Sequence, residues 1–373
     1  MAGLYVHIPF CRSRCRYCSF NSYMGLEGLI PRYVSALIAE AQGWAGAIEV
    51  DTIYFGGGTP SLLSAGQLGD ILGALRRAFV VDPGAEITVE VNPGTASAGS
   101  LAAMRALGVN RVSLGVQSLD DRELGMLGRI HTAAEAVAAF EMARGSFDNV
   151  SIDLLYGLPG QGLGRWRRTL ERALGLGPEH LSLYPLSVEE GTPLAQAIAQ
   201  GRMSPPDADL AAEMYQLAEE ALGAYRHYEL SNWARPGREC RHNLAYWHNL
   251  PYLGLGAGAH SCLGGSRFYN VASPREYIAR VAGEVPGEGA IAGSEPIAEA
   301  LEMAETMILG LRLEEGVGLD RLALRFGGDA VARYRSQIDE LKCLGLLEEG
   351  EGHVRLTARG RLLGNEAFLR FLP

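Results

Sequence analysis

Three cysteines near the N-terminus constrain this chain more than any other feature. Cys11, Cys15 and Cys18 form a C-x3-C-x2-C pattern directly after a short apolar run, Leu4 to Ile8, that is typical of a strand. Thiols this close along one loop can all point into the same small space. A cubane iron–sulfur cluster needs such an arrangement, because each thiolate binds a different iron. Three thiolates would leave the fourth iron of a [4Fe–4S] cluster open to an outside ligand.

A zinc loop and three unrelated thiols are the alternative interpretations of the triplet. Structural zinc sites commonly use four ligands, often as two C-x2-C pairs, and the sequence offers no second pair. Six cysteines in 373 residues, three of them clustered, do not look like a disulfide framework either. We therefore predict a cluster site. The spacing resembles that of the radical S-adenosylmethionine (SAM) superfamily, which implies that the amino and carboxylate groups of SAM chelate the open iron.

Composition restricts the class of protein. Hydrophobic residues make up 47% of the chain and charged residues 20%, which is typical of a globular protein with a large buried core. The net charge of −10 at pH 7 argues against a general affinity for nucleic acid, and we expect no nucleic-acid partner. We find no N-terminal signal pattern and no apolar run of membrane-spanning length. We therefore expect a cytoplasmic protein in a reducing compartment.

Strand-like and helix-like segments alternate along the first half of the chain. Periodicity predicts strands at 4–8, 52–55, 87–91, 111–116, 150–155 and 180–185, and helices at 31–44, 65–79, 100–107, 133–143 and 166–174. Apolar strands separated by helices indicate a parallel sheet with right-handed crossovers. Six such units are too few for a closed eight-unit barrel. We predict an α/β fold with a partial (β/α)6 barrel over 1–187, the shape that the radical SAM resemblance also implies.

The pattern changes after this barrel. We interpret 188–280 as an extension that faces the substrate or heme, with a long helix at 207–225, and 281–296 as a linker. The remainder, 297–373, resembles a winged-helix α+β module, with helices at 297–310, 319–326, 331–344 and 358–372 and a hairpin at 347–356. Its many glutamates make it too acidic to read a phosphate backbone. We expect it to be a structural cap.

A glycine-rich turn follows the second predicted strand. Gly57, Gly58 and Thr59 lie in the string GGGTP, and glycine lets the backbone approach a ligand closely. A tight turn between a strand and a helix is the alternative. Radical SAM enzymes use a similar glycine-rich edge to bind the amino group of SAM, and the position of this turn after the cysteine triplet favours that role.

Polar residues also stand at or near the ends of later predicted strands, where parallel sheets place their sites. Glu90 lies inside an apolar strand, and burying its charge is costly without a partner. The other members of this set are Gln117, Arg129 and Asp153. Each alone is explained by a salt bridge or a polar pair that lines the barrel. Together they favour one shared ligand.

Longer strings extend the resemblance over nearly the whole chain. They are YVHIPFC, GGGTP, EVNP, SLGVQS, GRIH, DLLYGLPGQ, YPLSVEEGTPL, YELSNWARPG and RHNLAYW. These strings resemble the oxygen-independent coproporphyrinogen III oxidase family of radical SAM proteins and, within it, the HemW-like heme chaperones. The resemblance implies that Tyr5 lies close to the cluster and that SAM is contacted by Glu90, Gln117, Arg129 and Asp153.

Two departures from the oxidase pattern are visible. The oxidase proper has a fourth cysteine two residues after the third, and Phe20 occupies that position here. The oxidase also has an N-terminal extension ahead of its first strand, which this sequence lacks. Both departures put decarboxylation of coproporphyrinogen III in doubt, and both are found in the HemW-like branch.

The string HNxxYW is a hallmark of the HemW-like branch. His242 offers an imidazole that can ligate heme iron, and Tyr246 and Trp247 offer aromatic faces for the flat macrocycle. The alternative is a packed corner in which these side chains fill a core. Further possible iron ligands are Cys240, His248, His260 and Cys262. A zinc group on Cys240, His242 and His248 lacks a fourth ligand.

The resemblance implies a heme chaperone that binds a [4Fe–4S] cluster, SAM and heme, and that transfers heme to apoproteins such as membrane-associated respiratory cytochromes. Two enzymatic alternatives remain open. One is coproporphyrinogen III dehydrogenation, in which a 5′-deoxyadenosyl radical starts the oxidative decarboxylation of two propionates to vinyl groups. The other is a related radical SAM methyltransferase or cyclopropanase.

Overall fold

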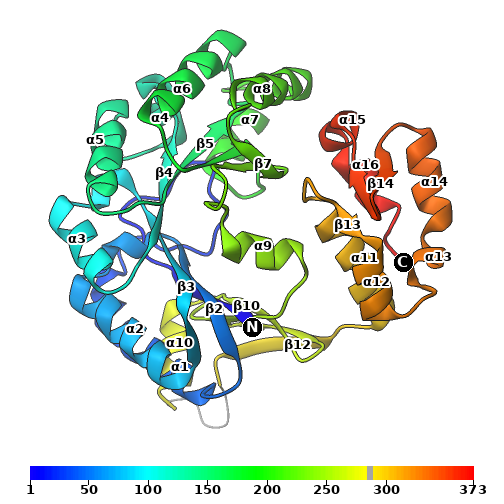
Figure 1. The fold of residues 1–373 in the computed structure, drawn as a ribbon. Coiled ribbons are helices and arrows are strands. Elements are labelled where there is room, and N and C mark those ends of the chain that lie inside the picture. The colour runs from blue at the N-terminus through cyan, green and yellow to red at the C-terminus, as the bar shows by residue number, and fades with distance from the viewer. Residues whose placement is uncertain (284–288) are drawn as a thin grey trace.

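The computed structural model describes residues 1–283 and 289–373. Six neighbouring parallel strands form the centre of its main sheet (Figure 1). They are β1 (Ala2–Ile8), β2 (Glu49–Gly57), β3 (Val80–Val91), β4 (Arg111–Gln117), β5 (Val150–Tyr156) and β6 (His180–Pro185). They pair in sequence order, and their carboxyl ends therefore meet along one rim of the curved sheet. The predicted partial (β/α)6 barrel is confirmed.

Helices connect these strands and cover the convex face of the sheet (Figure 1). They are α1 (Ile30–Gly43), α2 (Ala65–Ala78), α3 (Ala98–Ala106), α4 (Asp121–Leu127), α5 (Ala133–Arg144) and α6 (Leu163–Leu176). Short 3-10 turns precede three of them: η1 (Glu27–Leu29), η2 (Pro60–Leu62) and η3 (Pro93–Thr95). Helix α2 begins with a capping box between Ser64 and Gln67, the arrangement that satisfies otherwise unpaired backbone N–H groups at a helix start.

The sheet extends beyond the six predicted strands at both edges. Its order is β12-β11-β10-β9-β1-β2-β3-β4-β5-β6-β8-β7 within the described residues. The added strands are β7 (Arg226–Glu229), β8 (Asn232–Ala234), β9 (Tyr252–Leu255), β10 (His260–Leu263), β11 (Ser266–Asn270) and β12 (Ile291–Pro296). Strand β12 falls within the range expected to be a linker, and it pairs antiparallel with β11. Residues 284–288 of that range lie outside the described part of the chain.

The extension also contains the helices α7 (Pro193–Ala199), α8 (Ala208–Ala221), α9 (Arg241–Trp247) and α10 (Pro274–Val281). Helix α9 lies on the concave side of the sheet, facing the interior of the barrel (Figure 1). Its start is fixed by Glu86 of β3, whose carboxylate accepts hydrogen bonds from the backbone N–H groups of Arg241 and His242, each at 3.1 Å. A carboxylate at a helix N-terminus also interacts favourably with the positive end of the helix dipole.

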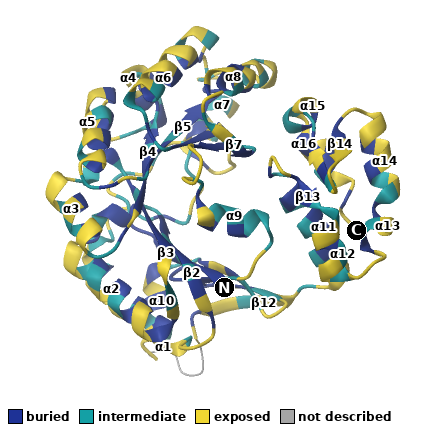
Figure 2. Cartoon of the chain, viewed as in Figure 1, coloured by how far each residue is buried: buried dark blue, intermediate teal, exposed yellow. Residues whose placement is uncertain are grey.

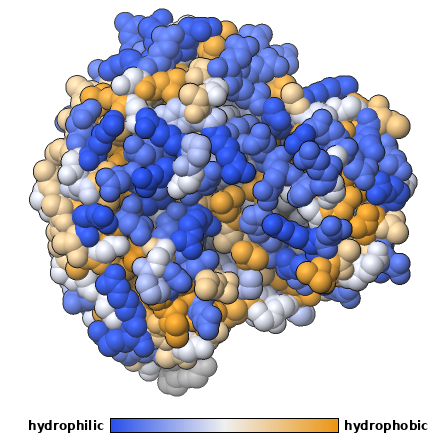
Figure 3. All heavy atoms as spheres, in the orientation of Figure 1, coloured by the Kyte–Doolittle hydropathy of each residue, from blue (hydrophilic) through white to orange (hydrophobic). Residues whose placement is uncertain are grey.

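The inner strands are mostly buried, and exposed residues lie on the outer faces of the surrounding helices (Figure 2). Apolar side chains from these strands and from α1, α2, α5 and α6 form one large core. Hydrophilic residues cover most of the face drawn in Figure 3. No helix within 1–283 or 289–373 is both long enough and apolar enough to cross a membrane.

The C-terminal region has its own apolar core and a three-stranded sheet in the order β13-β15-β14. Its elements are α11 (Glu299–Gly310), β13 (Val317–Gly318), α12 (Leu319–Phe326), α13 (Ala330–Arg333), α14 (Arg335–Cys343), β14 (Leu347–Gly350), β15 (His353–Leu356), α15 (Ala358–Leu362) and α16 (Gly364–Leu369). The helices expected at 331–344 and 358–372 are each split in two. Backbone hydrogen bonds from Leu230 to Arg312 and from Glu314 to Tyr228 join this region to β7 and its turn.

Candidate functional site

The main cavity of about 470 Å³ opens at the carboxyl ends of the barrel strands and extends into the lumen. A volume of this size is typical of ligand pockets. The cavity is lined by every site residue expected from the sequence except Trp247: Tyr5, Cys11, Cys15, Cys18, Gly57, Gly58, Thr59, Glu90, Gln117, Arg129, Asp153, His242 and Tyr246. Segments that are far apart in the sequence therefore contribute to one enclosed space.

The cysteine loop runs between β1 and α1. Its start is fixed by hydrogen bonds from the N–H of Cys11 to the carbonyl of Tyr23 at 2.9 Å and from the N–H of Tyr23 to the carbonyl of Pro9 at 2.7 Å. Further along, the N–H of Arg16 donates to the carbonyl of Leu127 at the end of α4. The loop is thus anchored at both ends, and its three thiols line the cavity.

Two side chains from other loops donate to these thiols. The hydroxyl of Thr59 lies 3.4 Å from Sγ of Cys11, and Nη1 of Arg129 lies 3.2 Å from Sγ of Cys15. Hydrogen bonds and a positive charge beside sulfur favour the thiolate over the thiol. Desolvation by burial acts in the opposite direction and raises the pKa of the Cys11 and Cys18 thiols. Metal binding would therefore have to displace protons.

The three thiols fit a cluster better than a single metal ion. Among the described residues, no three His, Cys, Asp or Glu side chains converge closely enough to hold one ion. The thiolates of a cubane bind different irons, so they need to surround a common space without converging on one point. The three thiols of the cysteine loop line one cavity, are partly buried and are free of disulfides.

The glycine-rich edge of β2 packs directly against the cysteine loop. A Cβ atom on Gly57, whose φ is 111°, would lie 2.4 Å from the ring of His7, and one on Gly58 would lie 2.8 Å from the carbonyl oxygen of Phe10. Only glycine fits such close approaches. The backbone of this turn therefore reaches the cavity beside the thiols, with Thr59 directly after it.

Glu90 is the carboxylate nearest this glycine edge. It accepts hydrogen bonds from the hydroxyl of Tyr54 at 2.9 Å and from the N–H of Gly57 at 3.2 Å. Burial raises the pKa of Glu90 to about 7, and the nearby Asp153 carboxyl adds to the increase. A bound ammonium or a ligand hydroxyl would favour the ionised form. The site therefore suits the cationic or hydroxyl-bearing part of a ligand.

Asp153 of β5 is held by one serine of the neighbouring strand β4 and one serine of its own strand. The hydroxyl of Ser113 donates to both of its carboxylate oxygens at 2.9 and 3.0 Å, and the hydroxyl of Ser151 donates to one of them at 3.2 Å. Burial raises the pKa of Asp153, while these hydrogen bonds lower it. The sequence alone did not point to these serines. Ser151 lies two residues before Asp153 on β5, and Ser113 lies two residues before Gly115, the partner of Asp153 on β4.

Arg129 connects the cysteine loop to β4. Its Nη2 donates to the carbonyl of Gly115 at 2.6 Å, while its buried Nε has no hydrogen-bond partner among the described residues. A buried donor without a partner is costly, and an acceptor on a ligand would satisfy it. Gln117, at the end of the same strand, has a φ of 69°, which is uncommon for a residue other than glycine and marks a sharp turn at the cavity rim.

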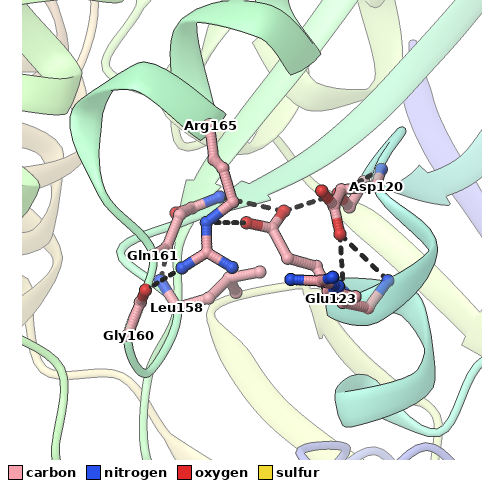
Figure 4. Close-up of polar contacts among 8 residues, drawn as sticks. Asp120, Glu123, Leu158, Gly160, Gln161 and Arg165 are labelled. Carbon is pink, nitrogen blue, oxygen red and sulfur yellow. Dashed lines mark hydrogen bonds and ion pairs between the residues drawn. The ribbon is translucent and has the colours of Figure 1, made fainter.

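A buried network supports the loops that follow β4 and β5 (Figure 4). Glu123 accepts hydrogen bonds from Ser118 at 2.6 Å and from Gln161 at 3.2 Å, and Nε of Arg165 lies 4.0 Å from its other carboxylate oxygen. Burial raises the pKa of Glu123. This network ties together the strand ends that carry Gln117 and Asp153. The sequence analysis missed it, because Glu123 lies in the unexpected helix α4.

Helix α9 places His242 deep in the lumen, where the residue is 1% exposed. Both of its ring nitrogens have partners: Nδ1 lies 2.8 Å from the hydroxyl of Thr52 and Nε2 lies 2.9 Å from the hydroxyl of Tyr246. Burial lowers the pKa of His242 to about 3, so the imidazole is neutral. For His242 this arrangement agrees with the packed-corner alternative, whereas Tyr246 and Trp247 line cavities and do not fill a core.

Trp247 does not face the main cavity. It lines a second cavity of about 320 Å³ between α9 and the C-terminal region, and the guanidinium of Arg312 lies 4.4 Å from its ring centroid. Of the further possible iron ligands, only His248 lines this second cavity, while Cys240, His260 and Cys262 line neither. Cys343, in α14, is exposed.

The chain matches two family models. One, described as the radical SAM superfamily, covers residues 5–173, and the other, described as the HemN C-terminal domain, covers residues 299–363. Among solved structures, coproporphyrinogen III oxidase (HemN) from Escherichia coli superposes with a TM-score of 0.85 at 25% identity, covering 99% of this chain and 89% of that one.

Curated relatives match over the full length. The heme chaperone HemW of Mycobacterium tuberculosis is 39% identical over 97% of this chain and 93% of its own length. The heme chaperone HemW of Bacillus subtilis is 37% identical over 100% and 99%, and that of Escherichia coli is 35% identical over 99% and 98%. The chain therefore belongs to the HemW heme chaperone family within the radical SAM superfamily.

Proposed function

We propose that this chain is a heme chaperone that holds a [4Fe–4S] cluster on Cys11, Cys15 and Cys18, binds SAM beside it and transfers heme to apoproteins such as respiratory cytochromes. The observation that supports this most is the single cavity that collects the three thiols and the residues expected to contact SAM. The full-length similarity to curated heme chaperones supports heme as the cargo.

Different residues of the cavity would bind the cluster and the separate groups of SAM. A cluster on the three thiols would supply one open iron and a source of single electrons. Arg129 and Thr59 would stabilise the thiolates by the hydrogen bonds they already donate. Glu90 would attract the amino group of SAM, with the backbone of Gly57 beside it. Asp153 would accept hydrogen bonds from ligand hydroxyls.

Phe20 favours the chaperone over the oxidase. It occupies the position of the fourth cysteine of the oxidase, it lines the main cavity and it is 65% exposed. A phenyl ring there can neither ligate iron nor carry a proton, whereas an exposed aromatic face suits an apolar macrocycle. We therefore propose that heme is carried by the protein and that no porphyrinogen is decarboxylated.

Helix α9 is the proposed contact with heme iron. His242 and Tyr246 line the cavity from this helix, but Nε2 of His242 is engaged by the hydroxyl of Tyr246. Ligation through Nε2 requires this hydrogen bond to open. Such a ligand would bind heme reversibly, because release of the iron restores the hydrogen bond. Reversible binding suits a protein that passes its cargo on.

Heme transfer from a cluster-free variant tests the proposal. Cys11→Ala removes one cluster ligand, and Cys343→Ala, at an exposed position of α14, is the matched control. Each protein is loaded with heme and mixed with an apocytochrome, and the heme spectrum of the acceptor is followed. A carrier variant without its cluster should still bind heme stoichiometrically. Failure of the wild type to bind heme, or to pass it on, would contradict the proposal.

A further inference from the structure

One cation in the lumen has no direct partner. Arg111 begins β4 and is 2% exposed, and it lines the main cavity. Its Nε is buried without a hydrogen-bond partner. Within 1–283 and 289–373, no carboxylate oxygen lies within the 4.0 Å of an ion pair from its guanidinium. Burying a charge without such a partner is costly.

The nearest anion is already committed elsewhere. Burial acts to lower the pKa of Arg111, but the charges of Cys240 and Glu86 raise it. The carboxylate oxygens of Glu86, however, accept hydrogen bonds from the N–H groups of Arg241 and His242 and lie 3.5 Å from Sγ of Cys240. Glu86 therefore caps helix α9 and does not form an ion pair with the guanidinium. The guanidinium group of Arg111 therefore remains available to a ligand.

Arg111 is the first residue of β4, at the opposite end of this strand from the rim that carries the cysteine loop. Six residues along β4 separate it from Gln117, which corresponds to about 20 Å at a rise of about 3.3 Å per residue. The residues between them that line the cavity are Ser113 and Gly115, which leave the passage open. The start of β4 therefore lies well below the rim, and the charge of Arg111 acts on Glu90 and Asp153, where it favours the ionised forms.

The lumen wall next to this cation is aromatic. The ring of Tyr54 stacks on that of His242 with centroids 5.1 Å apart, and it stacks on that of Tyr5 with centroids 6.3 Å apart. All three residues line the same cavity as Arg111. A ligand that combines a flat apolar body with an acidic group would match both features.

We propose that Arg111 forms a subsite for a carboxylate group at the floor of the lumen, below the residues expected to bind SAM. A guanidinium fork binds a carboxylate through two parallel hydrogen bonds. The identity of this carboxylate rests on the proposed function, which makes it a propionate of heme. The carboxylate of SAM is the other source of the same chemistry, and the experiment separates the two.

The test compares ligands with and without their carboxylates. Affinities of heme and heme dimethyl ester, and of SAM and decarboxylated SAM, are measured for wild type, Arg111→Met, Arg111→Lys and the exposed control Arg105→Met. If a propionate binds here, wild type prefers heme over its ester at least about tenfold, Arg111→Met binds both alike, and Arg111→Lys retains part of the preference. If Arg111→Met instead loses only the preference between SAM and decarboxylated SAM, the subsite belongs to SAM.

Two results would overturn the subsite. One is an Arg111→Met protein that discriminates both ligand pairs as the wild type does. The other is a wild type that prefers neither heme over its dimethyl ester nor SAM over decarboxylated SAM. A wild type that binds no heme would contradict the proposed function, while the SAM pair would still test Arg111.

Discussion

The cysteine loop and helix α9 line the same cavity but differ in how their polar groups are satisfied. The thiols of the loop have few donors beside them, and the neighbouring Arg129 keeps an unpaired Nε. On α9, both nitrogens of His242 are already bonded. The first region therefore has bonding capacity for a cofactor, whereas the second must break an internal bond before it can bind. That difference suits a resident cofactor at one end and a released cargo at the other.

The largest expected effect is at the cysteine loop. Cys15→Ala removes a thiol that receives a hydrogen bond from Arg129, so the variant should lose nearly all of its cluster after anaerobic reconstitution. Iron and sulfide analysis should fall from about four per chain to near zero. Cys262→Ala, outside both cavities, should retain the cluster. Equal iron content in both variants would contradict the assignment of the cysteine loop as the cofactor end of the cavity.

Glu90 should determine SAM affinity at the same end of the cavity. Glu90→Gln keeps the shape but removes the negative charge, and SAM affinity should fall about tenfold or more. Because burial holds the pKa of Glu90 at about 7, wild-type affinity for the cationic ligand should rise as pH increases through this value and ionises the carboxyl. Calorimetry across this range should show the rise in wild type and a flat profile in the variant.

His242→Ala should destabilise the protein by about 2–4 kcal/mol, because it leaves a cavity and removes the partners of Thr52 and Tyr246. Chemical denaturation measures this loss. His260→Ala, which changes an exposed histidine outside both cavities, is the matched control and should stay close to wild type. A stable His242→Ala protein would show that the packed arrangement contributes little.

The smallest change sharpens the comparison on α9 itself. Tyr246→Phe keeps the ring but frees Nε2 of His242. If heme iron binds this nitrogen, heme affinity should rise several-fold, because a hydrogen bond of about 1 kcal/mol no longer has to open. Heme titration followed by absorbance measures the change. An unchanged affinity would remove His242 from the candidate iron ligands.

Much of the barrel could be predicted from periodicity, because its buried strands are continuous apolar runs separated by amphipathic helices. Strand β3 begins at Val80, seven residues before the expected start, since Asp82-Pro83-Gly84 has the composition of a turn. The edge strands were harder to predict. Gly254, in a glycine-rich stretch, belongs to β9, where a Cβ atom would lie 2.2 Å from the carbonyl oxygen of His260.

The candidate site was predictable where residues cluster in short motifs at strand ends. The floor of the lumen was not, because Arg111 at the start of β4 and Glu86 within β3 are ordinary charged residues whose burial depends on α9 closing over them. The partner of Nδ1 in His242 was equally hidden, since Thr52 is 190 residues away in the sequence. Long-range hydrogen bonds of this kind follow from the packing and leave no local signal.

The central claim is that this radical SAM fold carries heme and does not process porphyrinogen. The most direct measurement is to supply the anaerobically reconstituted protein with SAM, a strong reductant and coproporphyrinogen III, and to assay protoporphyrinogen IX. We predict no product from a sample that still binds heme stoichiometrically. Product formed over multiple turnovers would contradict the account and would show that the fourth cysteine is dispensable.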